Sequence, residues 1–297
     1  MKKYTLFFIS MLMFNLSALA QEKLYVYSKD GSVAEFVTSN VEEIGFEETV
    51  VPYIPTDSGF VFKKFSINPV EKVYFSPGNL QYHPYNGEWR FAPNQINHVG
   101  KANANIHPNY NGWIDLFGWG TGDNPTKSSI NWEDYQFFTD WGANEISGYP
   151  ANTWRSLSYN EWNYLLYERE NASNLIAVAR VDGNNCVILL PDDWKCPTDV
   201  ELKLGFGVSD DAYASVQIID AADWAKIEST GAVLFLACGY RSGTTINDLQ
   251  ENCRYWIGYW HMDFTASMFY GTAARASLEF TYPYDGLAVR LVSTETY

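Results

Sequence analysis

The sequence has few histidines and cysteines, the residues that most often bind zinc and copper and, for cysteine, form disulfide bonds or act as thiol nucleophiles. It contains four histidines and four cysteines among 297 residues. No H-E-x-x-H pattern, G-x-S-x-G elbow or Walker-type loop occurs, so the zinc, serine-hydrolase and nucleotide chemistries of those motifs are not predicted. The cysteines permit a disulfide bond without requiring one, so free thiols and a single bridge both stay open. The histidines are His83, His98, His107 and His261; the cysteines are Cys186, Cys196, Cys238 and Cys253.

Positive charge is also scarce. Lys and Arg number 20 against 35 Asp and Glu. Residues 1–20 hold two of the lysines and no acid, so the remaining chain carries 18 − 35 = −17. Nucleic acids and anionic membranes are bound by basic surfaces, and we therefore expect neither as a partner. The acidity favours solubility, with carboxylate-rich loops that bind Ca²⁺ as the alternative.

One long apolar run is present, and it lies at the N-terminus. Lys2 and Lys3 precede the apolar residues 4–16, and Ala18 and Ala20 provide the small residues of a cleavage site. This pattern predicts a signal peptide over residues 1–20. The run is shorter than the roughly 20 residues that a membrane-spanning helix needs. We expect an exported protein, in the periplasm, at the cell surface or outside the cell, whose mature chain does not insert into a membrane.

Aromatic residues, glycine and proline are abundant. Aromatics make up 17% of the chain, with 21 Gly and 12 Pro, a composition typical of short strands joined by tight turns. Residues 21–50 predict a β-hairpin appendage with Asp30 and Gly31 in its turn. Residues 51–59, with two prolines, predict a linker, and residues 60–293 one larger domain.

Two helices are predicted within that domain. Ser158 and Glu161 have the spacing of a capping box, and Trp162 begins an apolar face that continues through Leu165, Leu166 and Arg169. A second helix is expected to start at Asp220, to bury Trp224 and Ile227 and to stop at Gly231. Two helices among many short, mostly antiparallel strands predict the α+β class.

The order of motifs resembles the formylglycine-generating-enzyme branch of the C-type-lectin-like fold, and most closely its secreted major-paralogous-domain proteins. The helix start has Arg155, Leu157, Ser158, Glu161, Trp162 and Tyr164 where that family has Arg-Leu-Pro-Thr-x-x-Glu-Trp-x-Tyr. The likeness covers about residues 60–293 and implies a C-type-lectin-like (sulfatase-modifying-factor-like) domain. Further matches are "VYFSPGNLQY" (73–82), "WIDLFGWGTG" (113–122), "ILLPDDW" (188–194), "GYRSG" (239–243), "YW" (255–256) and "GLAVRLV" (286–292).

The resemblance also bears on catalysis. The enzymes of this branch use a pair of redox-active cysteines that hold copper. The corresponding residues here, 261–280, contain no cysteine. A fold does not fix a function, and we therefore expect a protein that is not an enzyme and has no catalytic residues and no required cofactor.

Tryptophan and tyrosine in the predicted loops are candidate binding residues, because large rigid rings anchor sugars and protein partners; dense packing of long loops is the alternative. Residues 256–271 depart most from the proteins that the chain resembles, and the resemblance implies that they lie on the side that binds ligands in the C-type-lectin-like fold. Asp192 and Asp193 are calcium candidates, with a solvated turn as the alternative. The predicted ligand contacts are Trp119, Trp141, Trp256, Ile257, Gly258, Tyr259, Trp260, His261 and Met262.

The sequence therefore predicts an exported, non-enzymatic protein that binds a glycan or a surface protein. Three alternatives stay open. The first is a variable binding protein of a diversity-generating retroelement, since such lectin-fold proteins vary in this C-terminal part. The second is a surface adhesin or assembly component that uses the hairpin edge for strand addition. The third is an oxidase of the formylglycine-generating type, against which the missing cysteine pair counts.

Overall fold

The structure is a computed structural model, and it describes residues 23–27, 33–37, 61–205, 216–261, 265–272 and 274–294. By its internal contacts the chain divides into two units, residues 1–50 and 51–297. The predicted signal peptide, linker and Asp30–Gly31 turn lie outside the described residues.

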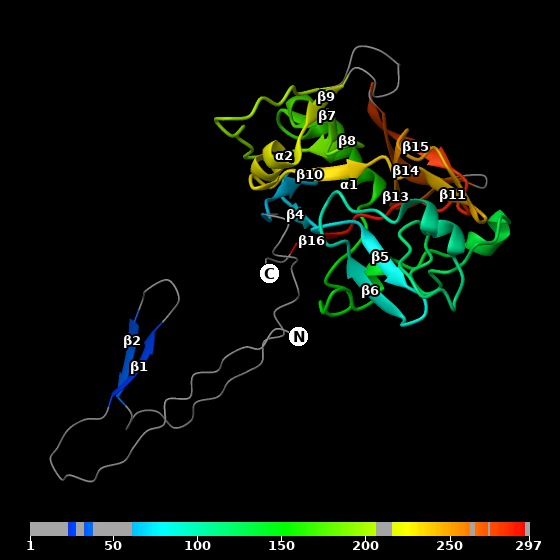
Figure 1. Cartoon of the computed structure of the whole chain (residues 1–297), viewed down its shortest axis with the longest axis horizontal. Helices are drawn as coiled ribbons and strands as arrows, with labels where there is room; N and C mark the ends of the chain where they lie inside the picture. Colours follow the sequence, from blue (N-terminus) through cyan, green and yellow to red (C-terminus); the bar gives the residue numbers. More distant parts are fainter. Residues whose placement is uncertain are drawn as a thin grey trace, which may run out of the picture. The chain divides into compact units, whose positions relative to one another are not determined.

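The first unit contains a two-stranded antiparallel sheet (Figure 1). Strand β1 (Lys23–Tyr27) pairs with β2 (Val33–Val37) over five residue pairs. This confirms the hairpin that the alternating pattern predicts. Among the described residues no third strand joins this sheet.

The second unit is built around a four-stranded sheet in the order β10-β8-β7-β9. Three of these strands are almost wholly buried, because most of their residues are Val, Ile, Leu, Ala and Phe. Strand β9 pairs parallel with β7, and the other pairings are antiparallel. The strands are β7 (Ile176–Val181), β8 (Asn184–Leu189), β9 (Gln217–Ile219) and β10 (Val233–Leu236).

The remaining strands form small antiparallel sheets. A three-stranded sheet has the order β13-β14-β15, a second has the order β16-β4-β3, and two hairpins stand beside them (Figure 1). Their bounds are β3 (Phe65–Ser66), β4 (Lys72–Phe75), β5 (Leu80–His83), β6 (Glu88–Phe91), β11 (Tyr240–Ser242), β12 (Thr245–Asn247), β13 (Cys253–His261), β14 (Thr265–Gly271), β15 (Ala276–Thr281) and β16 (Val292–Ser293).

Both predicted helices are confirmed. Helix α1 (Tyr159–Asn163) starts at a capping box in which Ser158 accepts from the backbone N–H of Glu161, and Glu161 accepts from that of Ser158. It continues as a π-helical turn over Tyr164–Glu168. Helix α2 (Ala221–Glu228) starts at the predicted cap, Asp220. Short 3-10 turns occupy Gly100–Asn105, Trp132–Tyr135, Trp141–Ala143 and Ala172–Asn174.

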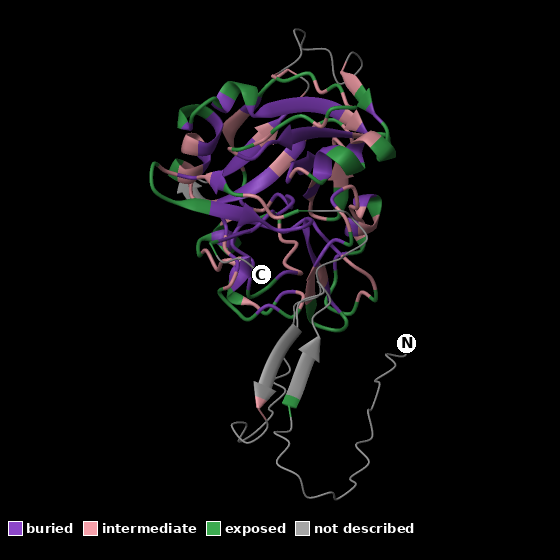
Figure 2. Ribbon diagram, turned by 90° about the vertical axis from the view of Figure 1, so that its left-hand side faces the viewer, coloured by how far each residue is buried: buried purple, intermediate pink, exposed green. Residues whose placement is uncertain are grey.

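Two hydrophobic clusters form the core of the second unit, and the buried strands stand out in Figure 2. The first joins α1 and α2 to the four-stranded sheet, and Trp162 stacks there on Phe269 with ring centroids 4.9 Å apart. The second is rich in tryptophan and packs the Gly-, Asn- and Asp-rich region of residues 103–153 against β5, β6, β13 and β14. That region contains short 3-10 turns and isolated β-bridges, and its buried aromatics pack it against the strands.

The protein therefore belongs to the mixed α+β class, with many short antiparallel strands and few helices. Within the described part of the chain, no helix has the length and apolar character needed to cross a bilayer.

Candidate functional site

The aromatic residues proposed from the sequence as ligand contacts are mostly core residues, which corrects the expectation that they are exposed. Trp119 and Trp256 are 3% and 2% exposed, and Trp141 and Ile257 are 0% exposed. The indole N–H of Trp119 donates to the carbonyl of Ile257 at 3.1 Å, and that of Trp256 donates to the carbonyl of Phe117 at 2.6 Å. These two indoles tie the 113–122 region to β13, so their rings stabilise the fold.

The other proposed contacts lie on or after β13. Gly258 is half-buried, and its N–H donates to the carbonyl of Leu157. Tyr259, Trp260 and His261 are strand residues, but their side chains lie outside the description. Met262 lies outside the described residues altogether. Ligand contact by Tyr259, Trp260, His261 and Met262 therefore stays a prediction.

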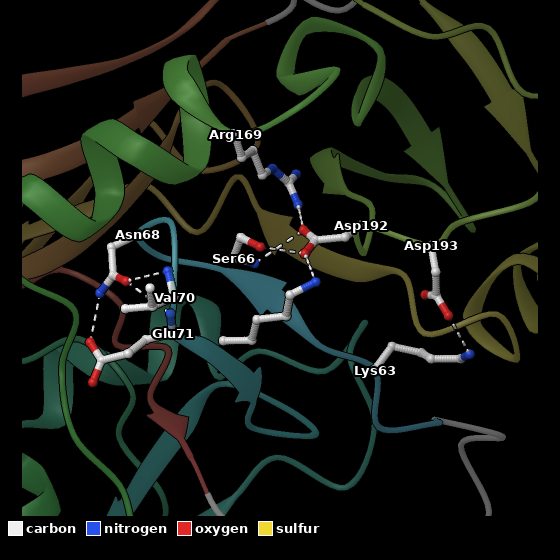
Figure 3. A network of polar contacts seen from close by, with 9 residues as sticks. Lys63, Ser66, Asn68, Val70, Glu71, Arg169, Asp192 and Asp193 are labelled. Carbon is white, nitrogen blue, oxygen red and sulfur yellow. Dashed lines mark hydrogen bonds and ion pairs between the residues drawn. The ribbon is translucent and has the colours of Figure 1, made fainter.

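The two proposed calcium ligands face cations. Both oxygens of Asp192 are engaged: Lys72 and Arg169 lie 2.8 and 3.1 Å away, and the backbone N–H and hydroxyl of Ser66 donate at 3.0 and 2.5 Å (Figure 3). Asp193 pairs with Lys63 at 3.0 Å. A calcium site needs several oxygen ligands with uncompensated negative charge, so this pair does not fit calcium. Among the described residues, no group of three or more His, Cys, Asp or Glu is placed to hold a metal ion.

Three of the four cysteines are buried. Cys186 and Cys238 are buried free thiols, Cys196 is exposed, and the Cys253 thiol donates to the carbonyl of Phe235. Burial raises the pKa of both the Cys186 and the Cys238 thiol well above the ordinary value. A redox-active thiol needs the opposite shift, since the thiolate is the reactive form.

A pocket of about 520 Å³ lies beside the β5–β6 hairpin, and we call it the Trp89–Trp113 pocket. It is open to solvent and combines two half-buried indoles with charged and small polar residues. Its lining residues are Gly87, Glu88, Trp89, Arg90, Trp113, Glu145, Ser147 and Gly148.

Cross-strand pairs of the hairpin position two of these residues. Tyr82 is opposite Trp89, with ring centroids 4.6 Å apart, and Gln81 is opposite Arg90. The guanidinium of Arg90 lies 3.6 Å from the centroid of Trp113, a cation–π geometry. This contact fixes a charged group and an aromatic ring together at the wall of the pocket.

A buried layer holds Arg90 in place. Its Nε donates to the side-chain oxygen of Gln81 at 2.9 Å, and Gln81 in turn hydrogen-bonds the buried carboxyl of Asp115. Asp115 also accepts from the amide of Asn103 at 2.7 Å and from the backbone N–H of Val99 at 2.7 Å. Burial raises the pKa of Asp115, and these hydrogen bonds oppose the shift. Because this layer already restricts the side chain of Arg90, a ligand that binds there loses less free energy to ordering that side chain.

A tight turn forms another part of the wall. Ile146 and Tyr149 exchange both backbone hydrogen bonds, and the two residues between them, Ser147 and Gly148, have φ angles of 52° and 81°. Positive φ at both positions is the geometry of a two-residue hairpin turn, which favours glycine. Ser147 is also hydrogen-bonded to β6: its backbone N–H donates to the backbone carbonyl of Trp89, and its hydroxyl accepts from the backbone N–H of Phe91.

The pocket offers three kinds of contact at once. Glu88 and Glu145 are exposed carboxylates that accept hydrogen bonds, Arg90 donates them, and the indoles provide apolar surface. A ligand with a single strong charge would be repelled, an anion by Glu88 and Glu145 and a cation by Arg90. A neutral molecule with many hydroxyls and an apolar face matches all three.

None of the pocket residues was proposed from the sequence. The available signal was the stretch "YNGEWRFAP" (85–93), where Trp and Arg follow a glycine turn. Its proximity to Trp113 and Glu145 depends on tertiary contacts that no local pattern reveals. Searches of family models, curated proteins and solved structures find no match to this chain.

Proposed function

We propose that this protein is an exported, non-enzymatic binding protein that takes a neutral saccharide in the Trp89–Trp113 pocket. The observation that carries the proposal is the preorganised pair of Arg90 and Trp113 beside two exposed carboxylates. Indoles contact the C–H faces of sugar rings, and charged donors and acceptors bind their hydroxyls. The proposed scaffold is the C-type-lectin-like domain that the order of sequence motifs implies.

The thiols support a binding role over the oxidase alternative. Burial raises the pKa of Cys186 and Cys238, which disfavours the thiolates that thiol redox chemistry requires. Titration of the mature protein with Cu(I) should therefore show no tight thiolate-dependent binding.

Binding of cellohexaose, mannohexaose and xylohexaose by calorimetry tests the proposal. We expect at least one of them to bind, and Trp113→Ala to weaken that binding at least tenfold, which is about 1.4 kcal/mol. Glu145→Gln, at an exposed position, should also weaken it and leaves the indole packing intact. Phe137→Ala is the control, because Phe137 is 87% exposed and does not line the pocket.

Trp260→Ala tests the sequence-based alternative. Loss of binding in Trp260→Ala, with Trp113→Ala unaffected, would move the site to residues 256–262. Absence of binding to every neutral glycan, or equal binding by all variants, would refute the proposed function.

A second candidate function is surface assembly through the first unit. The β1–β2 sheet is two-stranded, and a two-stranded sheet gains stability from a further strand. Deletion of residues 21–50 should then abolish assembly and leave saccharide binding unchanged. Unchanged assembly after the deletion would exclude this role.

A further inference from the structure

A second pocket, of about 330 Å³, lies where β3 and β4 meet the segment that follows β8. It is open to solvent, and we call it the lysine pocket. It is independent of the Trp89–Trp113 pocket, with which it shares no lining residue. Its lining residues are Phe62, Lys63, Lys64, Lys72, Tyr74, Asp192 and Asp193.

The lysine pocket has more positive than negative groups, although the chain as a whole has a net charge of −15. Asp192 is shared by Lys72 and the buried Arg169, and Asp193 pairs with Lys63 (Figure 3). Lys64 is exposed, and its ammonium lies over the ring of Tyr74, 5.5 Å from the centroid. The lining has three lysines against two aspartates, 3 − 2 = +1. Arg169 lies behind Asp192, outside the lining, and adds a further positive charge.

Two aromatic rings form the apolar part of this pocket. Phe62 and Tyr74 meet edge to face with centroids 6.1 Å apart. The antiparallel register pairs Phe65 with Val73, so the next position along each strand brings Lys64 beside Tyr74. The ammonium group and the ring surface are thus held next to each other by strand pairing.

We propose that the lysine pocket binds a small organic anion, a carboxylate or sulfate group carried on a ring. The anion neutralises the surplus positive charge that Lys64 and Lys72 provide, and the ring of the ligand packs against Phe62 and Tyr74. Asp192 and Asp193 are already compensated by cations and therefore repel such a ligand less than unpaired carboxylates would. Acidic sugars, either uronates or sugar sulfates, have this chemistry.

The test is calorimetric titration of the full mature chain with glucuronate, glucose 6-sulfate, inorganic sulfate and neutral glucose. We expect one of the two acidic sugars to bind, inorganic sulfate to bind more weakly because it has no ring, and glucose not to bind at this pocket. Which acidic sugar binds identifies the source of the anionic group. Raising the salt from 0.05 to 0.5 M should weaken binding several-fold, since exposed charges are screened.

Variants of Lys64 locate the site. Lys64→Gln should weaken binding about tenfold, and Lys64→Arg, which keeps the charge, should restore most of it. Lys101→Gln is the matched control, because Lys101 is an exposed lysine that does not line the pocket. Failure of both acidic sugars to bind, equal binding of glucose by the Trp113→Ala variant, or a Lys64→Gln effect below twofold would each overturn the proposal. Because neutral hexasaccharides and Trp113→Ala test the other pocket, either proposal can fail while the other stands.

Discussion

Replacing Asp192 with asparagine should destabilise the protein strongly, because Asp192 compensates a buried charge. The side chain of Arg169 is 1% exposed and that of Asp192 is 21% exposed, with the charged atoms 3.1 Å apart. Asparagine keeps the shape of aspartate but leaves the guanidinium without a counter-charge. Removal of one partner from a buried pair costs about 3 to 5 kcal/mol. Since Asp192 is partly exposed, we expect the lower end, about 3 kcal/mol, from urea denaturation.

The neighbouring residue provides a matched control. Asp193 pairs with Lys63 at 3.0 Å, but their side chains are 65% and 41% exposed. Exposed pairs contribute about 0 to 1 kcal/mol, so Asp193→Asn should change the free energy of unfolding by about 0.5 kcal/mol or less. Equal losses in the two variants would refute the role of burial. A loss below about 1 kcal/mol in Asp192→Asn would refute it too, because such a loss is close to that of ordinary surface substitutions.

Two further measurements isolate the charge. Burial raises the pKa of Asp192, but hydrogen bonds from Lys72 and Ser66 and the charge of Arg169 outweigh it, and the net shift is downward. A lowered pKa means that the stabilisation is present above the ordinary pKa of 3.8 and is lost as the pH falls through the folded-state pKa. The difference between wild type and Asp192→Asn should therefore shrink in acid. Adding Arg169→Met to Asp192→Asn should recover stability, since no buried charge then remains.

The remaining predictions concern the helix start and a buried acid. Glu161→Gln should lower the free energy of unfolding by about 1 to 2 kcal/mol. The reason is that Glu161 accepts hydrogen bonds from Arg155 at 2.6 and 2.9 Å and also closes the capping box. An equal loss in Asn160→Ala, at an exposed helix position, would contradict this. Burial raises the pKa of Glu228 to about 7 from 4.5, although Gln95 and Arg290 oppose it. The unfolding free energy should therefore fall as the pH rises from 4.5 to about 7, and Glu228→Gln should flatten that slope. A slope unchanged in the variant would assign the pH dependence to another group.

Local sequence patterns predicted the helices well. The capping box of Ser158 and Glu161 and the cap at Asp220 depend on atoms within four residues of one another, so they can be recognised without knowledge of the rest of the chain. The β1–β2 hairpin follows equally from its alternation and its turn residues. The sequence did not distinguish Arg169 from other residues at a helix end, because its partner Asp192 is 23 residues away.

The candidate sites could not be predicted in the same way. Trp119 and Trp141 stand among Gly, Asn and Asp, a context that usually indicates exposure, yet they are buried because the irregular region packs around them. The Trp89–Trp113 pocket brings the β5–β6 hairpin together with Trp113, which is 24 positions after Trp89, and with Glu145, which is more than 50 positions after it. Exposure and proximity of that kind are properties of packing between distant segments.

The sequence by itself determined the α+β class, the two helix starts and the strand pairing of the first unit, since short-range geometry and periodicity specify those features. The tertiary structure decided which aromatics are core and which line a pocket. It also showed that Asp192 and Asp193 neutralise cations rather than attract calcium. The physical reason is that burial and electrostatic compensation depend on the atoms that surround a side chain, and in this protein most of those atoms come from segments far away in the sequence.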